Sequence, residues 1–233
     1  MGKNGCGKTT LTKHINGLLI PTSGEVFIEN INTKHSNPCS KIAKIISMTF
    51  QNADEQILTS TVEDEVAFGL ENICFPSEKM NERIAKALDF VGLKGYEKRS
   101  TESLSGGQKQ KLMLACALAT EPKAIVLDEI TSMLDPVSQR DIMNILLKIN
   151  ETLKTSIIMI THNIHEAVLA KKIMLMKSGE IKISGKPKDI FSNFEMIKKL
   201  GIIPPESADL LKSLMGIYYK NLPKNENSPQ GVR

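Results

Sequence analysis

The sequence predicts an α/β fold built on a parallel β-sheet. Two wholly apolar runs, at residues 124–127 and 156–160, are typical of strands that are buried on both faces of such a sheet. Predicted helices alternate with the strands, which favours right-handed crossover connections. At the start of the chain, Gly2 to Thr9 fit the phosphate-binding pattern G-x-x-x-x-G-K-[ST]. We therefore expect an α/β core that binds a nucleotide.

The residue types of this P-loop suit a triphosphate. Its glycines let the backbone turn tightly, so that successive N–H groups point at the phosphates. Lys8 adds a positive charge for the β- and γ-phosphates, and the Thr9 hydroxyl can ligate Mg²⁺. The apolar-periodic run at 10–19 predicts a helix whose positive end faces the phosphates. The predicted nucleotide-binding residues of the loop are Gly2, Asn4, Gly5, Cys6, Gly7, Lys8, Thr9 and Thr10.

The residues before the loop are unusual, because a P-loop normally follows a buried strand and only Met1 precedes Gly2. We expect a core that is truncated at its N-terminus, from a native protein that begins several tens of residues earlier. A glycine-rich turn before an ordinary helix is the alternative reading of the loop. The motifs farther along the chain favour the P-loop.

Capping and periodicity signals place the other elements. Ser60 and Glu63 fit a capping box at a helix start, and Asp135 and Pro136 are typical of an N-cap followed by the first helical residue. A turn at 178–179 predicts a hairpin. The expected strands are at about 24–31, 44–50, 124–127 and 156–160, the hairpin at 173–183, and the helices at about 61–72, from 76 onward, at 106–119 and at 136–153.

These elements suggest a domain organisation. Residues 1–186 are expected to form the nucleotide-binding domain, with a small helical subdomain at about 52–104 inserted between its strands. Residues 187–220 are expected to form a helical C-terminal extension, with helices at about 188–200 and 206–219. The tail at 221–233 is polar with two prolines, and we expect it to be disordered.

Composition argues against several kinds of protein. The net charge of +4 is weak and scattered, and the chain has three tyrosines and no tryptophan, so nothing indicates a nucleic-acid partner. No apolar run approaches the roughly 18 residues of a membrane-spanning helix. The four cysteines are widely spaced without a C-x-x-C pair, which is typical of reduced thiols in a cytosolic protein.

Polar residues follow three of the predicted strands. In open α/β sheets, ligands bind beyond the carboxyl ends of the strands, which is where Gln51, Asp128 and His162 are expected. Asp128 follows a buried strand and is suited to hold Mg²⁺. Glu129 is placed to polarise a water that attacks the γ-phosphate, as a general base. A solvated acidic turn is the alternative, but such turns rarely follow so buried a strand.

A second glycine-rich helix start lies at 105–108. Ser105 and Gln108 form a capping box whatever the function is. A helix N-terminus opened by two glycines also binds anions, and because the P-loop already supplies one phosphate cradle, this one suits a nucleotide bound by another subunit. The predicted nucleotide-binding residues here are Ser105, Gly106, Gly107 and Gln108.

Leu104 to Gln108 resembles the signature motif of ABC ATPases, and its position between the P-loop and Asp128 is the order of that family. The resemblance implies a head-to-tail dimer that sandwiches two ATP, each held by one P-loop and the other subunit's signature. It further implies that residues 132–135 are the D-loop at the dimer interface. By this resemblance the catalytic residues are Glu129, the switch histidine His162 and the Q-loop glutamine Gln51, and the Mg²⁺ ligands are Thr9, Gln51 and Asp128.

Three further segments, at 13–18, 50–56 and 131–136, resemble the ATPases of energy-coupling factor transporters. This resemblance implies an ATPase at the cytoplasmic face of the cell membrane that powers import of vitamins or transition-metal ions. The implied partners are a second ABC ATPase subunit, identical or paralogous, a transmembrane coupling subunit and a substrate-binding membrane subunit. The alternatives are the ATPase of another ABC importer class, or a truncated cassette that binds ATP poorly and is inactive. DNA-repair relatives carry long coiled-coil insertions, and the sequence has no heptad repeat.

The chain departs from the family pattern in the P-loop. Cys6 stands where the family more often has serine or alanine. Either it is a small residue that simply fits, or it is an exposed thiol that the helix N-terminus and Lys8 activate. We expect the aromatic residue that stacks on adenine in the family to be missing, because it lies upstream of the P-loop.

Overall fold

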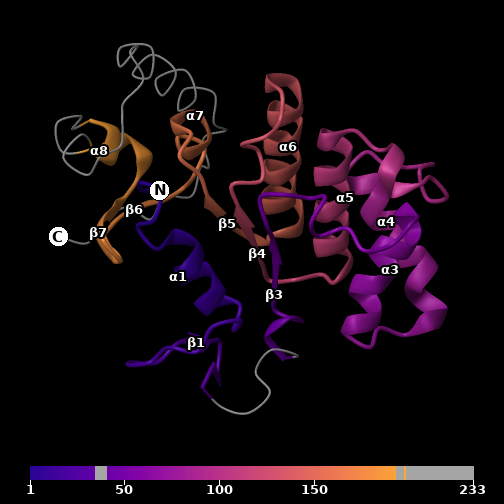
Figure 1. Cartoon of the computed structure of the whole chain (residues 1–233), viewed down its shortest axis with the longest axis horizontal. Coiled ribbons are helices and arrows are strands. Elements are labelled where there is room, and N and C mark those ends of the chain that lie inside the picture. The colour runs from indigo at the N-terminus through magenta and orange to yellow at the C-terminus, as the bar shows by residue number, and fades with distance from the viewer. Residues whose placement is uncertain (35–40, 193–196, 198–233) are drawn as a thin grey trace, which may run out of the picture. The chain divides into compact units, whose positions relative to one another are not determined.

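The computed structural model describes residues 1–34, 41–192 and 197, and it divides into two units. The larger unit is Gly7–Thr161, and the smaller unit combines Met1–Cys6 with His162–Arg233. The larger unit contains α1 (Lys8–Ile15), β1 (Phe27–Ile28), β2 (Ile31–Asn32), β3 (Ile46–Thr49), α3 (Val62–Asn72), η1 (Ser77–Lys79), α4 (Met80–Phe90), η2 (Thr101–Ser103), α5 (Gly106–Ala119), β4 (Ala124–Asp128), α6 (Pro136–Lys148), η3 (Ile149–Leu153) and β5 (Ser156–Ile160) (Figure 1). The smaller unit contains α7 (Ile164–Ala167), β6 (Ile173–Lys177), β7 (Glu180–Gly185) and α8 (Pro187–Phe191).

A three-stranded parallel sheet of order β3-β4-β5 is the centre of the larger unit. In its register Thr49 faces Leu127 and Asp128 faces Ile160, so the three strands end at the same edge. Residues 125–127 are completely buried, as their apolar run predicted. The predicted α/β fold with a parallel sheet is therefore confirmed.

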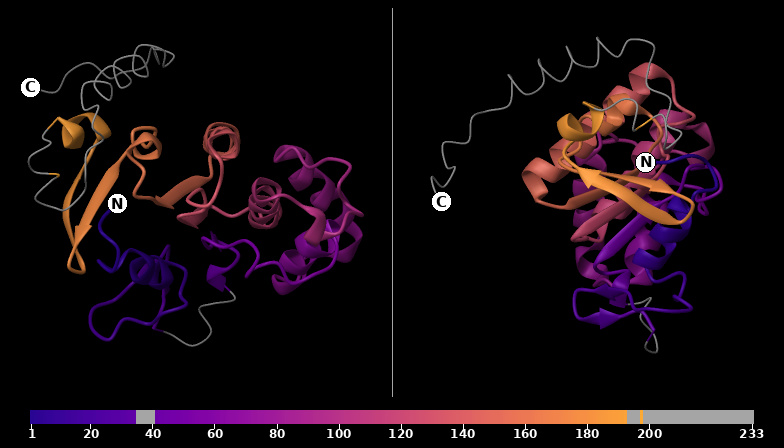
Figure 2. Two further views of the ribbon diagram at one scale, coloured as in Figure 1. Left: turned by 45° about the horizontal axis from the view of Figure 1, so that its top comes forward. Right: turned by 90° about the vertical axis from the view of Figure 1, so that its left-hand side faces the viewer.

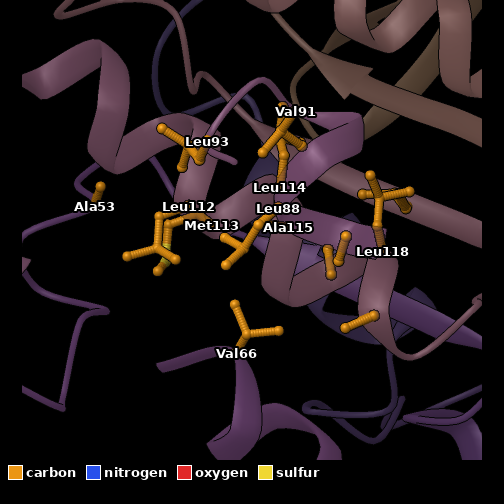
Figure 3. Close-up of a cluster of buried hydrophobic side chains, with 14 of the residues drawn as sticks. Ala53, Val66, Leu88, Val91, Leu93, Leu112, Met113, Leu114, Ala115 and Leu118 are labelled. Carbon is orange, nitrogen blue, oxygen red and sulfur yellow. The ribbon is translucent and has the colours of Figure 1, made fainter. Parts of the chain in front are cut away.

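Helices α3, α4 and α5 pack around an apolar core that also includes side chains of β4 and α6 (Figure 3). Val66 from α3, Leu88 from α4 and Leu112 from α5 are fully buried there. Burying a side chain such as Leu88 stabilises a fold by about 1.5–3 kcal/mol. Ile84, Leu88 and Val91 are all buried, which confirms the face predicted for the helix after Pro76.

A buried carboxylate fixes the loop that leads into α3. Oε2 of Glu65 accepts hydrogen bonds from the backbone N–H groups of Leu58 and Thr59, at 3.0 and 2.8 Å, and from the Thr59 hydroxyl at 2.9 Å. The helix begins one residue later than the predicted capping box, because Thr61 and not Ser60 is the N-cap and accepts from the Asp64 N–H. Both residues can cap a helix, and the tertiary position of the loop selects between them.

Two other predicted elements are wrong in their extent. The run at 24–31 is not one strand: β1 and β2 form a short antiparallel hairpin, because Glu29 between them takes a left-handed φ of 53°. The helix predicted at 136–153 remains α-helical only to Lys148 and continues as a π-helical turn, η3. Lys154, with φ 58°, ends it.

The smaller unit is organised around the hairpin β6–β7 (Figure 2). Ser178 and Gly179 both take left-handed φ angles, 51° and 81°, which confirms the predicted turn. The start of the chain lies along β6: the Met1 amino group donates to the Met174 carbonyl at 2.8 Å, and the Met176 N–H donates to the Met1 carbonyl at 2.8 Å.

The predicted division into a domain at 1–186, an inserted subdomain at 52–104 and an extension at 187–220 stays a prediction. Beyond α8, the predicted C-terminal helices and the tail at 221–233 lie outside the described residues, apart from residue 197. In the described ranges, each helix is too short or too polar to cross a membrane.

Candidate functional site

The first turn of α1 faces the end of β4. The Thr9 hydroxyl donates a hydrogen bond to Oδ2 of Asp128 at 2.7 Å. Next to it, Nζ of Lys8 lies 3.7 Å from Oε1 of Glu129. Lys8 and Asp128 are each only 7% exposed. Four of the predicted site residues are thus brought together as two adjacent pairs, which join the P-loop helix to the end of a buried strand.

Backbone geometry at the loop explains where α1 begins. Gly7 is the N-cap with φ 98°, a left-handed conformation that favours glycine, and its carbonyl accepts from the Leu11 N–H at 2.9 Å. The helix therefore starts at Lys8 and ends at Ile15, earlier than the predicted run at 10–19. This shift places Lys8 and Thr9 in the first turn, where the helix dipole favours anions.

Glu129 lies on a constrained piece of backbone. Its φ is 51°, in a region that costs a non-glycine residue roughly 1–2 kcal/mol. Its N–H donates to the Ile160 carbonyl at 3.0 Å, which ties it to the end of β5. Observed strain of this kind is concentrated at functional sites. The turn sends the Glu129 side chain toward Lys8 although Asp128 still pairs within the sheet.

Gln51 joins this group through the D-loop segment. Its Nε2 donates to Oγ of Ser132 at 3.0 Å, and the Ser132 hydroxyl donates to the Glu129 carbonyl at 2.8 Å. Gln139 of α6 holds the same segment, because its Nε2 donates to the carbonyls of Thr131 and Leu134, both at 3.0 Å. Gln51 is therefore linked to Glu129 through one serine hydroxyl.

The glycine-rich start of α5 has the predicted capping box, since the Ser105 hydroxyl accepts from the Gln108 N–H and the Gln108 side chain accepts from the Ser105 N–H. Gly106 and Gly107 form the first helical turn. This turn lies against the start of α6, where a Cβ on Gly107 would be 2.7 Å from Oγ of Ser138.

Asp135 begins α6 as predicted, with its carboxylate accepting from the N–H groups of Val137 and Ser138 at 2.9 and 3.0 Å. The Ser138 hydroxyl and these backbone donors hold the pKa of Asp135 below its usual value. The D-loop segment therefore ends in a charged cap that packs beside the signature glycines.

The remaining predicted site residues, Gly2, Asn4, Gly5, Cys6 and His162, belong to the smaller unit. The expectation of an exposed Cys6 thiol is wrong, because Cys6 is only 7% exposed. The reason is close packing: a Cβ on Gly2 would lie 2.6 Å from Sγ of Cys6 and 2.4 Å from the Met176 carbonyl oxygen. His162 follows β5 directly and is exposed, and Asn163 caps the short helix α7 behind it.

The oxygen atoms beside α1 fit a magnesium ion. Mg²⁺ prefers oxygen ligands and commonly binds through one or two protein groups together with substrate phosphates. The Thr9 hydroxyl and the Asp128 carboxylate are such a pair, next to the cationic Lys8. Over the ranges that the structure describes, no group of three or more His, Cys, Asp or Glu side chains could hold a metal by itself.

Comparison with known proteins identifies the family. The model of the ABC transporter family matches residues 1–132. The chain belongs to the ABC transporter family. It is similar to the energy-coupling factor transporter ATP-binding protein EcfA1 of Caldanaerobacter subterraneus, with 39% identity over 92% of this chain and 77% of that protein. The protein of the same name from Streptococcus mutans is 40% identical over 93% of this chain and 77% of its own length.

Solved structures of ABC cassettes have the same fold. The cbiO1 protein from Clostridium perfringens, described as part of the ABC transporter complex cbiONQ, superposes with a TM-score of 0.77 at 33% identity, covering 91% of this chain and 85% of that one. The ATP-binding cassette MJ0796, solved as a dimer bound to ADP and Pi, gives 0.71 at 30% identity over 80% and 83%. The predicted ABC ATPase fold is confirmed. The chain is an ATPase that binds ATP, as the sequence predicted.

Sequence reasoning missed two residues of this ABC ATPase. Ser132 was assigned to the D-loop, but its hydroxyl link between Gln51 and Glu129 was not expected. Gln110 in α5 was not singled out, and the structure buries it against Gln51. Helical spacing is the one sequence signal that Gln110 is buried. It lies three and four residues before the buried Met113 and Leu114, so it shares their face of the helix.

Proposed function

We propose that this chain is the ATP-hydrolysing subunit of an energy-coupling factor type importer of vitamins or transition-metal ions. The proposal rests on the paired contacts of α1 with the end of β4, Thr9 to Asp128 and Lys8 to Glu129. The names of the relatives support this class of transporter. Both relatives are named as energy-coupling factor transporter ATP-binding proteins, and both align along nine-tenths of the chain.

In this proposal each charged group has one role. Lys8 and the backbone N–H groups of the P-loop bind the β- and γ-phosphates, and Thr9, Asp128 and Gln51 hold Mg²⁺. The ion, when bound, neutralises charge that develops on the transferring phosphoryl oxygens. Glu129 takes the proton of the attacking water. The Ser132 hydroxyl donates to the Glu129 backbone carbonyl and so helps to fix the backbone from which the carboxylate extends. His162 is the switch histidine of this proposal, which contacts the γ-phosphate.

The signature motif gives the proposal a second subunit. The N–H groups at the start of α5, with the Ser105 cap, bind the phosphates of an ATP held by a partner's P-loop. The partner is a second ABC ATPase, identical or paralogous, and the dimeric cassette MJ0796 supports this arrangement. A transmembrane coupling subunit and a substrate-binding membrane subunit complete the importer. The chain then acts peripherally, at the cytoplasmic face of the membrane.

Steady-state ATPase activity tests the catalytic part. Glu129→Gln should retain ATP binding and lose hydrolysis by about 10²–10⁴-fold, the usual contribution of a general base. Glu151→Gln, a matched change at an exposed position in η3, should leave turnover unchanged. Turnover of the Glu129→Gln variant equal to that of the unaltered chain would remove Glu129 from this role.

Uptake by cells or reconstituted vesicles tests the transport part. Radiolabelled vitamins and Co²⁺ or Ni²⁺ are offered to membranes that contain the full transporter with either the unaltered chain or Glu129→Gln. We expect uptake of one of these substrates to stop in the variant. Uptake of every offered substrate that is identical in the two preparations would contradict the importer while leaving the ATPase activity in place.

A further inference from the structure

The side-chain amide of Gln110, in the helix that carries the signature motif, has a hydrogen-bond partner for its nitrogen but none for its oxygen in the part of the chain that the structure describes. Gln110 lies in the second turn of α5 and is 4% exposed. Its Nε2 donates to the backbone carbonyl of Gln51 at 3.0 Å. Its Oε1 is buried and has no hydrogen-bond partner among the described residues. A buried polar atom without a partner costs about 1–3 kcal/mol, so a leucine of similar size would suit the packing better.

The amide stands at the start of a chain of hydrogen bonds. From Gln110 the contacts run to the Gln51 backbone, from the Gln51 side chain to Ser132 at 3.0 Å, and from Ser132 to the Glu129 carbonyl at 2.8 Å. An ion pair between Lys109 and Asp54 joins the same turn of α5 to the segment after Gln51. The helix that carries the signature motif is thus tied at two points to the segment that carries Gln51.

We propose that Gln110 is a positioning residue, which holds Gln51 in register with the signature helix of the same subunit. A displacement of α5, such as occupation of its N-terminus by a nucleotide would cause, then reaches Gln51 and Glu129 through protein contacts. The cost of the unpaired Oε1 is offset by the N–H that the amide donates to the Gln51 carbonyl, which an apolar side chain cannot supply. This inference rests on the proposed ATPase site and adds a residue that its motifs do not contain.

The alternative is that Gln110 only fills space between α5 and β3. The two roles predict different effects of the substitution Gln110→Leu on turnover and stability. Leucine removes the unpaired Oε1 together with the donor, and the Gln51 carbonyl lies in an exposed segment that water can solvate. A space-filling role therefore predicts unchanged activity for Gln110→Leu, with stability unchanged or increased. A positioning role predicts lost turnover with the same stability.

The experiment measures three quantities on the full chain, in the oligomer in which it hydrolyses ATP: kcat, KM for ATP and the urea midpoint of unfolding. For Gln110→Leu we expect kcat to fall about tenfold or more, since small misplacements of catalytic groups can cost up to 10²-fold. KM should change by less than about twofold, because the P-loop contacts stay intact. Gln110→Glu keeps the shape and loses the donor, so its kcat should fall as well.

Ser47→Ala is the matched control. The Ser47 hydroxyl contacts the Ala117 carbonyl at 3.4 Å and Thr120 at 3.0 Å, in the same α5–β3 contact but at its far end. Its kcat should remain that of the unaltered chain. Unchanged kcat in both Gln110 variants would overturn the inference, as would a loss of kcat that only follows a lower unfolding midpoint. Glu129→Gln in the same assay separates the hypotheses: if that variant still turns over, the proposed function has failed, and not only the role of Gln110.

Discussion

Ser138 occupies the space that a side chain on Gly107 would need. A Cβ on Gly107 would lie 2.7 Å from Oγ and 3.0 Å from Cβ of Ser138. The same serine donates to the carboxylate of Asp135, and that hydrogen bond helps to lower the pKa of Asp135. The start of α5 and the start of α6 are therefore packed without spare room, and the absence of a side chain at Gly107 permits it.

Gly107→Ala should destabilise the larger unit by about 1–3 kcal/mol, the usual cost of overpacking a tight contact. Ser138→Gly combined with it should recover part of that loss, because both clashing atoms are removed. Urea unfolding of the single and double variants measures the coupling. Gly106→Ala is the stability control, since its Cβ would meet only Leu134 Cδ2, at 3.8 Å. Equal destabilisation by the Gly106 and Gly107 variants would contradict the steric explanation.

Thr9→Ala should weaken the binding of the Mg²⁺ that hydrolysis requires. The variant loses the hydroxyl that pairs with Asp128, so the concentration of Mg²⁺ for half-maximal rate should rise by about tenfold or more. Thr9→Ser restores the hydroxyl and should restore the ordinary value. Rates at saturating ATP over a series of Mg²⁺ concentrations give the comparison. Identical half-saturation in the alanine and serine variants would exclude Thr9 as a ligand.

The Asp135 cap should make stability depend on pH. Hydrogen bonds from the Ser138 side chain and from the backbone lower the pKa of Asp135 in the folded protein. Its charged form therefore adds stability above the unfolded-state pKa of about 3.9, and this contribution disappears as the pH falls through the folded-state pKa. At pH 7 Asp135→Asn should unfold at lower urea than the unaltered chain, and the gap should narrow toward pH 3. A gap that is constant with pH would count against the charged cap.

The thiols should differ in their reaction with maleimide. Cys74 is exposed and Cys6 is buried, and burial raises the pKa of the Cys116 thiol. In a Cys39→Ser background, we expect Cys74 to be labelled on the order of tenfold faster than Cys6 and Cys116 at neutral pH. Peptide mapping by mass spectrometry identifies each site. Equal labelling of Cys6 and Cys74 in the folded chain would show that the P-loop thiol is accessible after all.

Local signals predicted those parts of the fold that depend on short stretches of sequence. The Ser105 cap and the Asp135 start of α6 need only neighbouring residues to form, and the apolar run of β4 by itself marks a buried strand; all three were confirmed. The run at 24–31 failed because alternation cannot show that Glu29 takes a left-handed φ. Periodicity likewise cannot show where α6 becomes a π-helical turn.

The site was predictable in its residue types but not in its contacts. Strand-end positions indicated Gln51, Asp128 and Glu129, and the structure places all three in the larger unit. The hydroxyl of Ser132 and the amide of Gln110 act across the tertiary structure, and no local pattern indicates which backbone carbonyl each one meets. Such contacts depend on how two distant segments pack.

The parallel order of β3, β4 and β5 also decides when the site can exist. Thr9 and Asp128 are 119 residues apart in the sequence, and Gln51 and Ser132 are 81 apart. Closing such long loops is entropically costly and slow, whereas α3 and α4 pack over short separations. During synthesis the P-loop helix α1 emerges long before its partner strand β4. Helices α3 and α4 can therefore pack together before α1 meets β4, and the contacts of the ATP site form after theirs. Substitutions in β4 should therefore delay the appearance of ATP binding during refolding more than substitutions in α3 or α4.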